Sequence, residues 1–102
     1  MDLQKLTEKS QQSLAKAHEI STTQQHSEVQ PLHLLWAFLE DREGPVFAIL
    51  QRLKVPDTKL QGAVDQAMQK LPKVVGDTDR GISRDLQKVL EIAFEEARQR
   101  QD

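Results

Sequence analysis

The chain has 102 residues, of which 37% are hydrophobic and 29% charged, and a formal net charge of -2. This length allows a single modest core, and this charge gives no overall attraction to nucleic acid or anionic membrane. The absence of cysteine excludes disulfides and thiolate metal sites, and no apolar run approaches the roughly 20 residues of a membrane span. These features predict one small globular domain in the cytosol.

The first half of the chain predicts helices with different degrees of burial. Small and apolar residues recur at three- and four-residue steps over residues 3–21, which predicts an amphipathic helix with a lean buried stripe. The polar residues 21–27 then predict a loop. The next helix, residues 31–39, starts with a proline and is apolar almost all round, which is typical of a central helix. Pro45 marks the start of a short third helix.

The second half predicts two more helices joined by a long connection. Asp57 is the expected N-cap of a fourth helix, which stops at Pro72. Residues 72–81 contain glycine and proline without a helical period, so we expect an exposed connection. Ser83 is the expected N-cap of a last helix that reaches Arg100. The predicted fold class is therefore all-α, a compact bundle of about five helices without strands.

Residues 6–21 and 82–97 form an internal repeat with an offset of 90 minus 14, or 76. The alignment places Leu6 on Ile82, Thr7 on Ser83, Leu14 on Leu90 and Ala17 on Ala93. Any two amphipathic helices share a period, but the matched hydroxyl and small residues favour equivalence. We therefore expect residues 1–71 to form a first four-helix repeat and residues 72–81 a connecting loop. Residues 82–102 would be the first helix of a second repeat that is cut off.

Several irregular motifs together resemble the N-terminal repeat domain of Clp ATPases, most closely that of the ClpB-type disaggregases. They are LT.K at 6–9, PLHLLWAFL at 31–39, GPV..IL..L at 44–53, LPKVVG at 71–76 and S.DLQKVLEIA at 83–93. The resemblance covers the whole chain. It implies a domain of two tandem four-helix repeats, tethered flexibly to a hexameric AAA+ motor, that contacts unfolded or aggregated polypeptide or adaptor proteins. Because no GxxxxGK[ST] phosphate loop occurs, we expect no ATP hydrolysis by the chain itself.

The resemblance also implies candidate polypeptide-binding residues. Thr7 matches a position implicated in client handling, and the last predicted helix matches one that borders an apolar client groove. On that helix Leu90 belongs to the inward stripe, Ile92 lies well off it and Phe94 flanks it. Glu96 departs from the family pattern, because an apolar residue is expected there. Two simpler interpretations remain open: the Thr7 hydroxyl bonds to the preceding turn, and Ile92 is an isolated surface side chain.

The three histidines do not predict a metal or catalytic site. His18 lies on the polar shoulder of the first helix and His26 in a loop, and no pair has metal-ligand spacing, so we expect no convergence. His33 lies inside an apolar run. We interpret it as a core residue whose ring bonds to a backbone carbonyl or hydroxyl of the first helix or loop. A pH-sensitive core is the alternative. No GxSxG turn occurs. No catalytic residue, cofactor or metal is predicted.

The remaining charged and aromatic residues indicate surface and core. The acidic clusters at 40–43 and 95–96 are expected to be a solvated loop and helix face. Basic residues are scattered among acids, so no nucleic-acid site is predicted. Trp36, Phe38 and Phe47 are expected in the core. Two alternatives to client binding are a regulatory module that associates with itself through helix 82–100, and an adaptor-binding domain of a ClpA-like or ClpC-like unfoldase.

Overall fold

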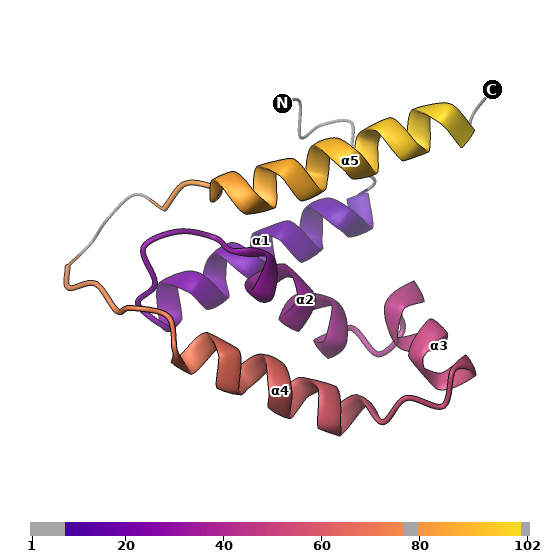
Figure 1. The fold of residues 1–102 in the computed structure, drawn as a ribbon, viewed down its shortest axis with the longest axis horizontal. Helices are drawn as coiled ribbons and strands as arrows, with labels where there is room; N and C mark the ends of the chain where they lie inside the picture. Colours follow the sequence, from indigo (N-terminus) through magenta and orange to yellow (C-terminus); the bar gives the residue numbers. More distant parts are fainter. Residues whose placement is uncertain (1–7, 77–79, 101–102) are drawn as a thin grey trace.

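The computed structural model describes residues 8–76 and 80–100, and these residues form five α-helices and no strand. In chain order the helices are α1 (Glu8–Thr23), α2 (Pro31–Glu40), α3 (Pro45–Arg52), α4 (Asp57–Gln69) and α5 (Arg84–Arg100). Figure 1 shows α5 and α1 along one side of the molecule, α4 along the opposite side and α2 between them. The predicted all-α class is confirmed. None of the described helices is long and apolar enough to span a membrane.

Helix α2 is central because it is apolar on nearly every side. Its residues enter both core clusters: one joins α1 and α5 to α2, and the other joins α1 and α4 to α2. The first cluster contains the buried residues Ala17, Val29, Leu34, Leu86 and Leu90; the second contains Ile20, Ala37, Leu39, Val64 and Met68. Burying these side chains is the main favourable contribution to folding. The predicted central position of this helix is therefore confirmed.

The helix boundaries follow the local signals with two exceptions. Pro31 and Pro45 occupy the first helical positions, as predicted. Helix α1 continues to Thr23 instead of ending at residue 21, and the Thr22 hydroxyl donates a hydrogen bond to the His18 carbonyl at 3.1 Å. The predicted cap of α4 is wrong: Pro56 holds the N-cap position with extended backbone, and Asp57 is already inside the first turn. There its carboxylate is favoured by the helix dipole.

Helix α5 begins with the serine cap that the sequence predicts. The Ser83 hydroxyl oxygen accepts a hydrogen bond from the Leu86 N–H at 3.1 Å, and Ser83 is buried. Replacing Ser83 with alanine is expected to lower the free energy of unfolding by about 1 kcal/mol, because the Leu86 N–H then has no partner. Urea denaturation measures the loss. The matched control is Ser27→Ala at an exposed loop position, and an equal effect of both changes would contradict the capping role.

The connection before α5 is tied to the loop after α1 by hydrogen bonds, and one of its residues is buried. Lys73 forms an antiparallel bridge with His26, and the Val74 N–H donates to the Gln25 carbonyl at 2.8 Å. Arg80 is only 8% exposed, and its Nε–H donates to the His26 carbonyl at 2.6 Å. The prediction of an exposed connection over 72–81 is therefore wrong for Arg80, whereas Lys73 and most other described residues of the connection are exposed. The reason is non-local: the loop after α1 supplies partners for the polar groups of the connection.

Candidate functional site

An apolar groove of about 420 Å³ lies between α1 and the extended segment that precedes α5. Its lining residues come from one face of α1, from the loop before α2 and from the residues just before Ser83. They are Gln11, Leu14, Ala15, His18, Val29, Arg80, Gly81 and Ile82. The four α1 residues are spaced i, i+3, i+4 and i+7, so they share one side of the helix and form one wall.

The opposite wall is fixed by main-chain hydrogen bonds. Val29 and Ile82 form a parallel bridge. The Val29 N–H donates to the Gly81 carbonyl at 3.0 Å, and the Ser83 N–H donates to the Val29 carbonyl at 2.9 Å. The Ile82 side chain packs against the first core cluster together with Leu14 of α1. The groove therefore lies over a packed cluster, and its walls are held before any ligand arrives.

The loop that carries Val29 is anchored by a buried pair of histidines. His26 Nδ1 and His33 Nε2 are 2.7 Å apart, and the Gln30 N–H donates to His33 Nδ1 at 2.8 Å. Because Nδ1 of His33 accepts, the neutral ring carries its proton on Nε2 and donates it to His26 Nδ1. The proton of His26 then lies on Nε2, a buried atom without a hydrogen-bond partner among the described residues.

This pair corrects two predictions from the sequence. His26 and His33 were expected not to converge, and a carbonyl or hydroxyl was expected as the partner of His33. The left-handed backbone of Gln25 (φ 61) lies between α1 and His26, and it turns the chain so that His26 meets the start of α2. The predicted burial of His33 is confirmed, since its exposed fraction is 0%.

Both histidines are held neutral by their surroundings. Burial lowers the pKa of His33 to about 4, and the nearby His26 adds to the effect. Burial also lowers the pKa of His26, as do the positive charges of Lys73 and Arg80, while the Met68 carbonyl opposes the change. A charged imidazole is costly in such a site. Neutral rings at physiological pH therefore keep the hydrogen bond between them intact.

The predicted polypeptide-binding residues occupy different environments. Ile92 is 63% exposed on α5, and Leu90 is buried at 6% exposure. Phe94 is half-buried and packs against the first core cluster, the same cluster that supports Leu14 and Ile82 of the groove. Thr7 lies outside the described residues.

The groove between α1 and Ile82 was not predicted from the sequence. The spacing of residues on α1 is visible in the sequence, but the position of Ile82 opposite them is not.

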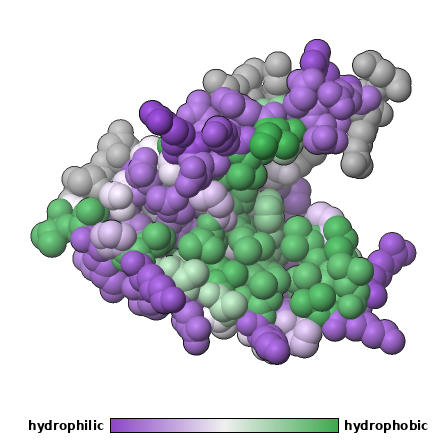
Figure 2. Space-filling view, viewed as in Figure 1, coloured by the Kyte–Doolittle hydropathy of each residue, from purple (hydrophilic) through white to green (hydrophobic). Residues whose placement is uncertain are grey.

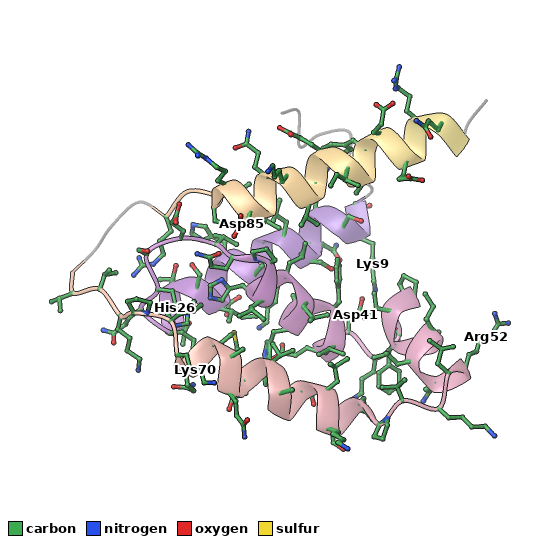
Figure 3. The ribbon with its side chains drawn as sticks, viewed as in Figure 1. Lys9, His26, Asp41, Arg52, Lys70 and Asp85 are labelled. Atoms are coloured by element: carbon green, nitrogen blue, oxygen red, sulfur yellow. The ribbon has the colours of Figure 1, made fainter. Side chains whose placement is uncertain are left out.

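The rest of the described surface carries apolar patches and ionic contacts. Figure 2 shows hydrophobic side chains gathered over α2 and α3, between more polar surfaces of α4 and α5. Lys9 and Asp41 point toward each other and form an ion pair at 3.2 Å (Figure 3). Within the described residues, no group of three or more His, Asp or Glu side chains is placed to hold a metal ion.

The five-helix fold places the described residues in a class of all-helical N-domains known from solved structures. The structure is similar to the "N-domain of ClpV from Vibrio cholerae", with a TM-score of 0.78, 26% identity, and coverage of 88% of this chain and 53% of that chain. The sequence is 33% identical over 106 aligned positions to "Chaperone protein ClpB" of Bacillus anthracis, covering 100% of this chain and 12% of the relative. It is 30% identical to the ClpB of Rhodopirellula baltica, covering 98% of this chain and 11% of the relative.

The model of the Clp repeat (R) N-terminal domain matches residues 5–102. The chain belongs to this family, and the resemblance identified from the sequence motifs is confirmed. The chain spans 12% of the length of its Bacillus relatives. Membership of the family therefore identifies residues 5–102 as a Clp repeat N-terminal domain.

Proposed function

We propose that the chain is the substrate-engaging N-terminal domain of a ClpB-like AAA+ protein disaggregase, and that it binds unfolded or aggregated polypeptide without catalysing a reaction. The observation that carries this proposal is the apolar groove of about 420 Å³ between α1 and residues 80–82. Hydrophobic contact is non-directional, so such a groove accepts many different apolar segments. This tolerance suits clients that share little beyond exposed apolar side chains.

The mechanism is local concentration of the client. The AAA+ motor of the parent hexamer hydrolyses ATP, and the N-terminal domain holds a client near the motor through weak contacts. Weak contacts are released quickly, since differences in affinity arise mainly from the dissociation rate. Ile92 offers a further apolar contact outside the groove, because its side chain is largely exposed on α5. Leu90 and Phe94 support the groove from the core cluster, and Thr7 completes the proposed set of client-contact residues.

A titration with an unfolded protein tests the proposal. We expect a chemically reduced and alkylated client to shift the NMR signals of groove residues such as Leu14 and Ile82. Filling the groove by Ala15→Trp is expected to weaken binding at least about fivefold, or roughly 1 kcal/mol. The matched control is Ala63→Trp, since both alanines are exposed helical residues and only Ala15 lines the groove. Absence of shifts at millimolar client, or equal weakening by both variants, would overturn the proposal.

A second candidate, a self-associating or adaptor-binding module, is favoured by the uncovered face of α5. Val89 and Ile92 are 46% and 63% exposed. Ala93 is also exposed, whereas its counterpart Ala17 in the proposed repeat is completely buried. This face could pair with a second copy or with an adaptor of a ClpA-like or ClpC-like unfoldase. Sedimentation at several concentrations tests self-association, and Ile92→Ser should abolish any dimer. A monomer at every concentration argues against it.

A further inference from the structure

The end of α3 and the turn that follows it expose three large apolar side chains. Ile49, Leu53 and Val55 are 54%, 68% and 39% exposed. Ile49 and Leu53 are four residues apart and share one side of the helix, and Val55 follows in the turn. We call these three residues the α3 patch; they belong to the hydrophobic surface over α2 and α3 in Figure 2. Neighbouring apolar side chains on a surface are typical of a site for a partner.

The charges around the α3 patch are positive. Residues 45–56 contain Arg52 and Lys54 and no acidic residue. The whole chain has 14 basic and 16 acidic residues, so the rest of it has 12 and 16, a net charge of -4. Both cations are exposed, and neither forms an ion pair with any residue that the structure describes. Arg52 points away from the body of the molecule (Figure 3).

The turn holds a lysine in a conformation that favours glycine. The φ of Lys54 is 58°, in the left-handed region. The Val55 N–H donates to the Leu50 carbonyl at 3.0 Å, and the Lys54 N–H donates to the Gln51 carbonyl at 3.1 Å. These two bonds form a Schellman motif, in which glycine is the usual residue at the position of Lys54. A side chain there costs stability, and such costs are typical of positions with a function.

The nearest acidic residues along the chain leave this positive charge in place. Asp57 is paired with Arg42 at 3.4 Å, and Glu43 precedes the opposite end of α3. Exposed apolar side chains beside unpaired cations complement a segment that has apolar and acidic side chains. An anionic membrane has similar chemistry, but the negative charge of the rest of the chain opposes its approach. A short protein segment contacts the α3 patch alone.

We propose that the α3 patch, together with Arg52 and Lys54, binds an apolar segment of a partner protein that carries acidic residues. Ile49 and Leu53 contact the apolar side chains of the segment, and the two cations pair with its carboxylates. None of these residues lines the groove between α1 and Ile82. The domain therefore has a second contact surface, which is independent of client binding in the groove.

A capped amphipathic peptide, with leucines along one helical face and glutamates elsewhere, tests the proposal with the whole chain. Fluorescence anisotropy of the labelled peptide measures its binding. Leu53→Ser is expected to weaken binding about tenfold. The matched control is Val75→Ser, since Val75 is 97% exposed and lies in the connection before α5, away from α3 in the sequence. Replacing the glutamates of the peptide with lysines should abolish binding, and added salt should weaken it.

Lys54→Gly separates a role in binding from a role in folding. Glycine adopts a positive φ without strain, so the variant should unfold at the same or a higher urea concentration. It should nevertheless bind the acidic peptide about threefold more weakly, because one cation is lost. Gln25→Gly is the matched control: Gln25 is the other described non-glycine residue with a positive φ, 61°, and its replacement should leave peptide binding unchanged.

Several results would overturn the proposal. They are no binding at millimolar peptide, equal binding of the glutamate and lysine peptides, and unchanged affinity in both Leu53→Ser and Lys54→Gly. A dimer in sedimentation that Leu53→Ser abolishes would identify a second copy as the occupant, and tighter binding to phosphatidylserine vesicles than to the peptide would identify a membrane. Ala15→Trp should leave peptide binding unchanged, so failure at the α3 patch is distinguishable from failure of client binding in the groove.

Discussion

Replacing His33 with alanine is expected to lower the free energy of unfolding by about 3 kcal/mol. The ring is completely buried and joins two partners, the Gln30 N–H and His26 Nδ1. Its removal leaves a cavity at the start of α2 and deprives both polar groups of their hydrogen bonds. Each unsatisfied buried group adds roughly 1 kcal/mol or more to the loss. Urea denaturation followed by circular dichroism measures the difference.

His18→Ala is the matched control for this change. His18 is an exposed histidine of α1, so its removal should alter stability by less than about 0.5 kcal/mol. Replacing both members of the buried pair with leucine should destabilise less than the sum of the two single leucine changes. Each single change leaves the other histidine ring without its partner, whereas the double change removes both rings. Strict additivity of the His26 and His33 substitutions would contradict a direct hydrogen bond.

The second large effect is a loss of stability in acid. His33 has a folded-state pKa of about 4, below its ordinary value of 6.5, and the pKa of His26 is also lowered. The unfolded chain therefore binds more protons than the folded one below about pH 6.5. The stability is fully present above this pH and is lost as the pH falls toward about 4. For His33 alone the loss amounts to about 3 kcal/mol.

Urea denaturation between about pH 7 and pH 4 measures this dependence. His33→Gln removes one of the two titrating rings, so its stability should fall less steeply with pH than that of the unchanged chain. We expect the same variant to be less stable at neutral pH. Ser27→Ala, which removes no titrating group, should keep the original slope. An unchanged slope in His33→Gln would show that the loss in acid arises from other groups.

The histidine pair also links the core to the groove. His26 holds the loop that includes Val29, and its carbonyl accepts the hydrogen bond from Arg80. Val29 in turn fixes the segment that contains Ile82. A break in the pair therefore loosens one wall of the groove as well as the start of α2. Acid or a substitution at His33 should raise hydrogen exchange at Val29 and Ser83, whose amides hold the bridge.

Local signals in the sequence account for most of the helices. Pro31 and Pro45 fix the φ of a first helical residue, and the Ser83 hydroxyl satisfies an N–H three residues later. Each of these effects depends on neighbours in the chain, so it can be predicted without the fold. Asp57 was misplaced by one position because both Pro56 and Asp57 are compatible with a helix start, and only the backbone conformation distinguishes them.

The sequence alone determined an all-helical domain, a central apolar helix around His33 and membership of a family, because helical periods, caps and motifs are properties of adjacent residues. The tertiary structure decided which distant residues meet. It joined His26 to His33 and buried Arg80 in the connection. It also placed Ile82 opposite α1 to form the groove. These contacts depend on the turn at Gln25 and on hydrogen bonds between segments far apart in the chain, which no local pattern encodes.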